Sequence, residues 1–182
     1  MQKYSGLKYS KFGYFIFLLS FLSVLISSCA KDADPKKMVV DTIPGAYFGK
    51  YTDAVAVQSV SGGEKTSPVG KPRISNDSFA EALKQSFSAN GLLNESHPKY
   101  LLSADITNLY QPLVGNSIGV TGAVIYRITD ARTGALVYNK TVYSKATTSE
   151  KEEHFYVAKM KMSNEGTIKA NIQGLLDSLL NR

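Results

Sequence analysis

The chain has 182 residues, of which 43% are hydrophobic, and a formal net charge of +6. This length is enough for one domain with a sizeable core. Lys3, Lys8 and Lys11 lie ahead of an apolar run, and without them the net charge falls to +3, too little to argue for nucleic-acid binding. Cys29 is the single cysteine, so a disulfide within the chain is excluded and the fold must rest on its core.

An export signal is predicted over residues 1–28. Three lysines precede an apolar run over residues 15–26, and small residues follow it. A run of about a dozen residues is short for a membrane-spanning helix, which needs about 20. A basic start, a short apolar segment and small residues before the cleavage point are typical of a secretory signal. A plain secretory signal with an incidental cysteine and an uncleaved anchor remain as alternatives.

The stretch Ile26-Ser27-Ser28-Cys29 resembles a bacterial lipobox. The resemblance implies that Ile26, Ser27 and Ser28 are recognised by the signal peptidase and that the chain is cut before Cys29. It also implies that the Cys29 thiol and the new amino group carry acyl chains such as palmitate. Several acyl chains should hold the protein stably on a membrane, because each buried methylene adds about 0.8 kcal/mol.

Residue 30 indicates the membrane to which the protein is sorted. The second residue of the mature chain is Ala30 and not aspartate. The sorting rule of bacterial lipoproteins then implies the outer membrane, on its periplasmic side. The inner membrane and another cell surface remain as alternatives. Residues 29–49 carry lysines, aspartates and prolines with little periodicity, which predicts a lipidated tether, and residues 50–182 are expected to form a periplasmic α+β domain.

The first half of the domain is predicted to contain a strand, a helix and a second strand. The first strand is expected over Tyr51–Val60, followed by a loop rich in glycine, proline and serine. A helix should begin at the capping residues Ser75 and Asn76 and end at Asn90-Gly91, because its apolar positions follow 3–4 spacing. Alternating apolar residues predict the next strand over Tyr100–Tyr110.

A hairpin and a last helix are predicted in the second half. Ile118, Val120, Val124, Tyr126 and Ile128 share one strand face, and residues 130–134 form a turn. A pairing of Thr129 with Ala135 would place Tyr126 opposite Tyr138 and Val124 opposite Lys140. The last helix is expected over residues 163–180, with Ile168, Ile172, Leu175, Leu176 and Leu179 on one side. Residues 155–162 are expected to pack as an early turn of that helix, the alternative being contact with a membrane or a partner.

The element order β-α-β-β-β-α predicts a two-layer α+β sandwich. Its mainly antiparallel four-stranded sheet would carry both helices on one face. The other face would then stay open and show Ile125, Arg127, Val137 and Tyr143, some of them apolar for exposed positions. These four residues are the predicted partner face, and an ordinary solvated sheet face is the alternative.

The sequence indicates no catalytic, cofactor or metal site. In the loop over residues 62–71, Lys65 stands where a phosphate loop needs glycine, and Pro72 stands where it needs serine or threonine. His97 and His154 have no further histidine or cysteine at ligand spacing, which argues against a metal ion. We therefore expect a protein that is not an enzyme and needs no cofactor.

Several motifs of the domain resemble a class of small bacterial envelope lipoproteins. These motifs are Asp77–Leu83 with Gly91–Leu93, Tyr100–Ala104, Val124–Asp130, Thr133–Val137 and Asn164–Ile172. The class includes the lipopolysaccharide-assembly lipoprotein and the auxiliary lipoproteins of ABC-type lipid transport. The resemblance implies an accessory or assembly factor of an envelope complex, with an envelope protein as its partner. A periplasmic module that binds lipid or glycan is the alternative.

Overall fold

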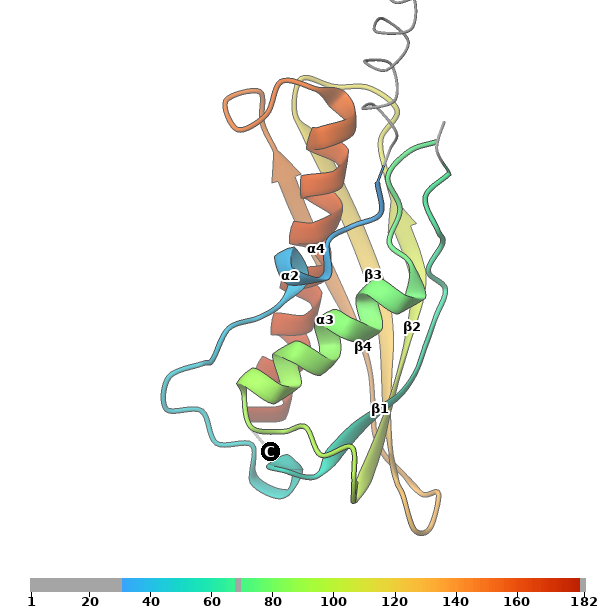
Figure 1. The fold of residues 1–182 in the computed structure, drawn as a ribbon, viewed down its shortest axis with the longest axis vertical. Coiled ribbons are helices and arrows are strands. Elements are labelled where there is room, and N and C mark those ends of the chain that lie inside the picture. Colours follow the sequence, from blue (N-terminus) through green and yellow to red (C-terminus); the bar gives the residue numbers. More distant parts are fainter. Residues whose placement is uncertain (1–30, 68–69, 181–182) are drawn as a thin grey trace, which may run out of the picture.

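Alternating apolar residues build four strands, which form one sheet in the computed structural model; it describes residues 31–67 and 70–180. The predictions on Ile26, Ser27, Ser28 and Cys29 lie outside these residues. The strands are β1 (Val55–Ser61), β2 (Tyr100–Tyr110), β3 (Ile118–Asp130) and β4 (Leu136–Thr148). Their order in the sheet is β1-β2-β3-β4 (Figure 1).

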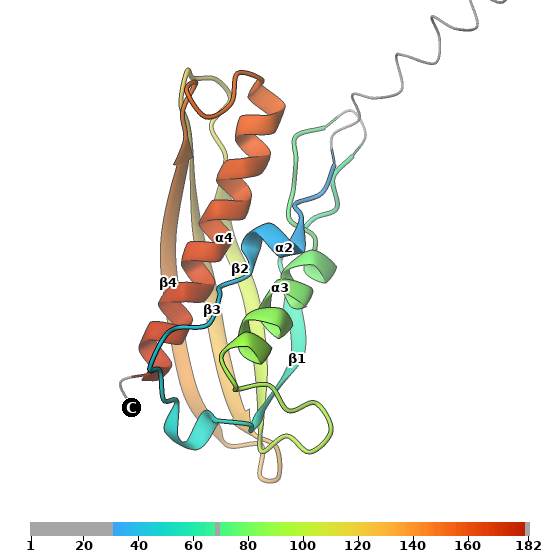
Figure 2. The same ribbon diagram turned by 60° about the vertical axis from the view of Figure 1, so that its left-hand side comes forward.

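Two long helices, α3 (Asn76–Ala89) and α4 (Tyr156–Leu180), pack on one face of this sheet. The short helix α2 (Pro35–Met38) lies against α3 and α4, and a 3-10 turn, η2 (Gly49–Tyr51), precedes β1. Figure 2 shows α3 and α4 side by side over the sheet, with the opposite face uncovered. The fold is therefore α+β, and its main elements follow the predicted order.

The sheet is mixed. β1 pairs with β2 in parallel, whereas β2–β3 and β3–β4 are antiparallel. The helix α3 joins β1 to β2, and such a crossover returns the chain in the same direction as the preceding strand. The expected mainly antiparallel sheet therefore needs this correction at its first pair.

Capping residues and apolar periodicity predicted most boundaries of the helices and strands correctly. The hydroxyl of Ser75 caps α3 by accepting the Ser78 N–H at 3.2 Å, and β2 has the predicted bounds. The first strand begins later than predicted, at Val55, because η2 buries the Tyr51 ring ahead of it. The last helix begins earlier than predicted, at Tyr156.

The predicted hairpin register is wrong by two residues. Val124 pairs with Val142, and Tyr126 pairs with Lys140. The register shifts between Ile128 and Thr129, so that one residue of β4 has no partner there. This bulge places the buried Val124 and Val142 opposite each other. A shift of two residues keeps each side chain on its face, so the buried face of β3 is as predicted.

The segment predicted as a tether is part of the folded domain from Ala33 onward. Met38, Val40 and Phe48 are buried in the main core. The Ser86 hydroxyl of α3 accepts the N–H of Val40 at 2.9 Å. The prediction of a free tether over residues 29–49 is therefore wrong for this part. The buried side chains are dispersed among polar residues and follow no period that a sequence pattern would reveal.

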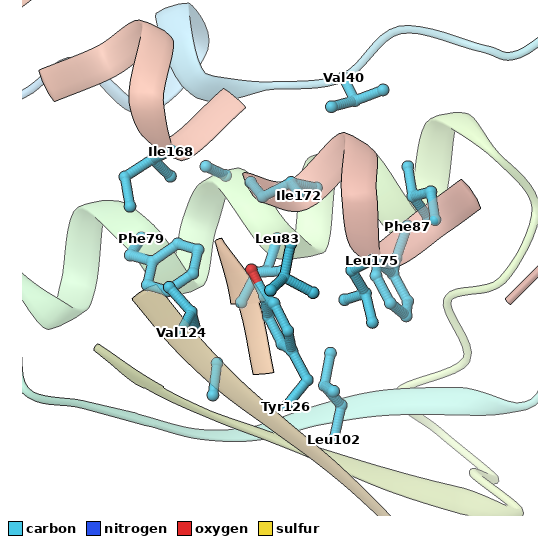
Figure 3. Close-up of a cluster of buried hydrophobic side chains, with 14 of the residues drawn as sticks. Val40, Phe79, Leu83, Phe87, Leu102, Val124, Tyr126, Ile168, Ile172 and Leu175 are labelled. Atoms are coloured by element: carbon cyan, nitrogen blue, oxygen red, sulfur yellow. The ribbon is translucent and has the colours of Figure 1, made fainter. Parts of the chain in front are cut away.

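The main core lies between the sheet and the two long helices (Figure 3). Three groups of buried side chains meet there. They are Phe79, Leu83 and Phe87 from α3, Ile168, Ile172 and Leu175 from α4, and Leu102, Val124 and Tyr126 from the sheet. The apolar stripes predicted for both helices are the ones that pack, since each stripe faces the sheet.

Polar side chains on α4 also bond to the sheet. The Ser163 hydroxyl accepts the Thr148 N–H at 3.1 Å and donates to the Ile118 carbonyl at 2.7 Å. One turn later, the Thr167 hydroxyl accepts the Ala146 N–H at 3.1 Å and donates to the Val120 carbonyl at 3.0 Å. Each hydroxyl therefore joins β3 to β4 at a pair of facing residues.

The amide of Asn171 continues this polar stripe. Its nitrogen donates to the Val142 carbonyl at 2.8 Å, and its oxygen accepts the Tyr126 hydroxyl at 2.8 Å. Burial raises the pKa of Tyr126 well above its ordinary value, so the phenol keeps the proton that it donates.

Glycines let α4 approach the sheet closely. A Cβ at Gly166 would lie 2.9 Å from the Ala146 Cβ, and one at Gly174 would lie 2.8 Å from the Val142 Cγ1. Contacts this short do not occur between real side chains, so a larger residue would push the helix away. The short approach is what brings the Ser163 and Thr167 hydroxyls within reach of strand backbone.

Replacement of Thr167 tests the hydroxyl bridges. Thr167→Val keeps the shape but leaves the Ala146 N–H and the Val120 carbonyl without this partner, so we expect a loss of about 2 kcal/mol in the free energy of unfolding. Thr141→Val, on the open face of β4, is the matched control and should change stability by less than about 0.5 kcal/mol. Urea unfolding measures both, and equal effects would contradict a special role for Thr167.

Candidate functional site

The described residues show surfaces where a site could lie and no cluster suited to metal chemistry. No three histidine, cysteine, aspartate or glutamate side chains gather to hold a metal ion in residues 31–67 and 70–180. His97 and His154 lie exposed in separate loops. Within the same residues, no helix has the length and apolar character needed to cross a membrane.

The four residues of the predicted partner face are not all brought together. Tyr143 is 79% exposed on the open face of β4, and Ile125 and Arg127 are half-buried on β3. Val137 differs, because it lies at the bulge of β4 and packs against the main core. Val137 therefore lies apart from the other three residues, and the exposed apolar part of this face is centred on Tyr143; the partner face itself stays a prediction.

A groove of about 440 Å³ lies beside Tyr143. It is open to solvent and runs over β2, β3 and β4; its lining residues are Asn108, Thr121, Gly122, Ala123, Tyr143, Ser144 and Lys145. A register shift between Ile106 and Asn108 places Asn108 opposite Ala123. Ala123 pairs with Tyr143, and its small side chain leaves room beside the ring, so this hollow follows from the register shift in β2 and from the small residue at position 123.

A second hollow of about 210 Å³ lies where the chain leaves β1. Gly62 lies there with φ +76°, and a Cβ on it would clash with the Ile106 carbonyl oxygen, so only glycine fits. Arg73 and Glu64 lie across the hollow from β2 and face each other at 3.5 Å. Their opposite charges offset each other, so this pair gives the hollow no net charge.

Exposed apolar side chains gather at one end of the domain. We call this set the apolar end: Tyr110, Leu113, Val114, Phe155, Val157 and Met162, which are 42% to 82% exposed. The set lies where β2 ends, β3 begins and α4 begins (Figure 1). The expected packing of residues 155–162 into the last helix is correct for Tyr156 and Met160, whereas Phe155 stays exposed.

Hydrogen bonds and a small core support the apolar end. The Tyr156 hydroxyl donates to the Pro112 carbonyl at 2.7 Å, and the Lys159 ammonium donates to the Asn116 carbonyl at 2.8 Å. Partial burial raises the pKa of Tyr156. Below these contacts, Ile118, Val120 and Met160 form a small core of their own. The β2–β3 loop is therefore held against the first turns of α4, and the exposed side chains have a fixed support.

The chain joins the fold beside the first half of α4. The N–H of Ala33 donates to the Arg73 carbonyl at 3.1 Å, and the N–H of Asp34 donates to Glu165 Oε1 at 2.8 Å. The Asp32 carboxylate accepts the Thr66 N–H at 2.6 Å. In both views the described chain begins in the upper half of the molecule, the half in which α4 begins (Figures 1 and 2). This position is fixed by three hydrogen bonds and is close to the apolar end.

Glu165 makes this attachment sensitive to pH. Burial raises the pKa of its carboxyl above the ordinary value, although the Asp34 N–H and the Lys161 ammonium at 3.7 Å act in the opposite direction. A carboxyl whose folded-state pKa is raised binds its proton more tightly in the folded state. The ionised form therefore costs stability at neutral pH, and this cost disappears as the pH falls through the raised pKa toward the ordinary value of 4.5.

Glu165→Gln should remove the cost of the charge and keep an oxygen for the Asp34 N–H. We expect the variant to gain stability relative to the parent protein at pH 7 and to lose that advantage near pH 4. Urea unfolding at the two pH values measures the difference in the free energy of unfolding between the variant and the parent protein. The other titrating groups are the same in both proteins, so their contributions cancel. A difference that stays constant between the two pH values would contradict the raised pKa.

Comparison with known proteins shows the fold. No protein-family model matches the chain, and no curated protein sequence matches it. Protein XCC0632 from Xanthomonas campestris, of the DUF330 family, has a similar structure with a TM-score of 0.60 at 14% identity, over 84% of this chain and 95% of that one. At this identity the similarity extends to the fold alone.

Two further structures are more distant. A candidate lipoprotein from Caulobacter crescentus CB15 has a TM-score of 0.46 at 16% identity, over 57% of this chain and 78% of that one. Protein CT253 from Chlamydia trachomatis has a TM-score of 0.45 at 15% identity, over 72% of this chain and 95% of that one. Of the three, the Caulobacter crescentus protein is the one described as a candidate lipoprotein. None of the three is described as a lipopolysaccharide-assembly or ABC-transport lipoprotein, so that resemblance stays a prediction.

Proposed function

We propose that this protein is a lipid-anchored protein of the bacterial envelope and that its domain assists a membrane complex as a non-enzymatic accessory or assembly factor. One observation carries the proposal. Ala33 is buried and bonded to the Arg73 carbonyl only four residues after Cys29. Four extended residues span at most about 14 Å. An acylated Cys29 would therefore hold the domain directly at the membrane surface.

Such a short connection gives the anchor a role in the mechanism. Several acyl chains on one residue anchor a protein stably. A domain held close to one bilayer meets partners of that bilayer at a high effective concentration, without any new contact. The outer membrane, on its periplasmic side, is the proposed place, because Ala30 follows the cysteine.

The open sheet face supports a protein partner for this domain. Tyr143 presents an amphipathic ring beside an open groove, and tyrosine is enriched at protein interfaces because it contributes area and a hydroxyl together. A module that binds lipid would use an enclosed apolar pocket. The two hollows described above are open to solvent, which favours the protein partner.

Replacement of Cys29 tests the anchor. Cys29→Ser should abolish incorporation of labelled palmitate and release the protein from the membrane fraction, because no thiol is left to acylate. Ser28→Ala keeps a small residue before the cleavage point and is the matched control, for which both properties should persist. Palmitate labelling with membrane fractionation measures them, and a Cys29→Ser protein that stays acylated and membrane-bound would refute the anchor.

Photocrosslinking tests the partner face. A photoreactive residue in place of Tyr143 should yield one defined crosslink to an envelope protein in intact cells, and the same residue in place of the exposed Tyr47 should not. Ala123→Arg fills the groove beside position 143 and should remove the crosslink while the protein stays anchored. A crosslink that survives Ala123→Arg, or equal crosslinks from both positions, would exclude this face as the docking surface.

A further inference from the structure

We infer that the apolar end contacts the same bilayer that holds the anchor, with Leu113, Val114 and Phe155 reaching into its headgroup region. The inference rests on the proposed acylation of Cys29 and adds a second, non-covalent contact to it. The domain would then stand on the membrane in one orientation instead of moving freely on its tether.

Exposed apolar side chains are concentrated at this end of the domain. Leu113, Val114 and Phe155 are 74%, 82% and 77% exposed, and they come from two loops at the same end of the sheet. Single exposed apolar residues are common on soluble proteins, but a group of them marks an interaction surface. The Tyr156–Pro112 and Lys159–Asn116 hydrogen bonds hold the two loops together, so the group is presented as a unit.

The chain between the anchor and the fold is short. Asp34 is bonded to Glu165, which lies nine residues after the first residue of α4 and thus about 14 Å below it along the helix. The five residues from Cys29 to Asp34 span at most about 17 Å, and less because Ala33 and Asp32 are bonded to Arg73 and Thr66. An acylated Cys29 therefore lies no further than about the level of the apolar end.

The opposite end of the domain is too far away for the anchor. The β3–β4 hairpin, which carries the 55% exposed Leu136, lies at the end opposite to the start of α4 (Figure 1). β4 alone has 13 residues and is thus about 44 Å long. Leu136 is therefore an exposed apolar side chain that the tether keeps away from the bilayer, which makes it a matched control.

Charge suggests that apolar contact dominates over attraction to anionic lipid. Two loops beside the apolar end carry charged side chains. They are Glu64, Lys65, Lys71 and Arg73 on one side and Glu150, Lys151, Glu152 and Glu153 on the other. The first group has an excess of two cations and the second an excess of two carboxylates, and the Lys159 ammonium, which bonds to the Asn116 carbonyl, adds one positive charge, so the net charge there is small. The contact should therefore form on zwitterionic lipid and depend little on salt.

A fluorescent label can report the contact in the full-length, lipidated protein. Once Cys29 is acylated, a cysteine introduced by Val114→Cys is the only free thiol, and Leu136→Cys provides the control in the same way. Both proteins carry an environment-sensitive dye and are reconstituted into phosphatidylcholine vesicles that contain spin-labelled lipid. We expect a blue-shifted emission and strong quenching for the dye at position 114 and neither for the dye at position 136, at low and high salt alike.

A second pair of variants tests the apolar side chains themselves. Leu113→Ser with Phe155→Ser should abolish most of the quenching at position 114, because each lost apolar contact lowers the ratio of docked to undocked protein by about tenfold. Leu136→Ser should leave the quenching unchanged. All these positions are exposed, so folding is preserved, and a far-UV spectrum checks it.

The outcomes separate the inference from the proposed function. Flotation of the same vesicles reports the anchor, and protein that is neither acylated nor floating would refute the proposed function. Protein that floats while the dye at position 114 stays accessible to water would overturn only the inference. A dye at position 114 that is shielded in cells but not in vesicles would show that a protein covers the apolar end, which would also overturn it.

Discussion

The close fit of α4 against β3 and β4 is the constraint on which the rest of this structure depends. Gly166 and Gly174 allow the helix to approach, and the hydroxyls of Ser163 and Thr167 then bridge the two strands. These polar contacts have a single register, since a helix displaced along the sheet would leave buried strand groups without partners. Every buried side-chain nitrogen or oxygen in the described part of the chain has a hydrogen-bond partner.

This one helix fixes both features that the proposed function uses. Its first turns hold the β2–β3 loop through Tyr156 and Lys159, and its buried Glu165 holds the N–H of Asp34. The distance between the apolar end and the point where the chain joins the fold is therefore set by the rise of a helix. Because this spacing is rigid, a short connection to an acylated Cys29 would also restrict the orientation of the domain on the membrane.

The two proposed surfaces are compatible because they lie on different parts of the domain. The apolar end lies at the end of the sheet where β2 ends and β3 begins. Tyr143 lies on the uncovered face of the sheet, opposite the helices. With the apolar end on the bilayer, the sheet would extend away from the membrane and leave its open face accessible from the side. A partner in the same envelope could then bind there while the anchor and the apolar contact hold the domain in place.

The sequence alone predicted what depends on neighbours along the chain. The bounds of β2, the cap of α3, the buried faces of both long helices and the alternation in β3 all follow from patterns within a few turns or a few residues. The lipobox at Cys29 is such a local pattern too, and it remains a prediction. Periodicity and capping act within one element, so they can be recognised before the fold is known.

Only the tertiary structure decided what depends on contacts between distant segments. The bulge in β4 moved the hairpin register, because it placed Val124 against Val142. Dispersed apolar residues such as Met38 and Phe48 are buried in the core, so most of the segment predicted as a tether belongs to the folded domain. Leu113 and Phe155 lie far apart in the chain and share one end of the domain only because β2 ends and α4 begins there. Packing and strand pairing are long-range effects, and no local pattern encodes which exposed residues they bring together.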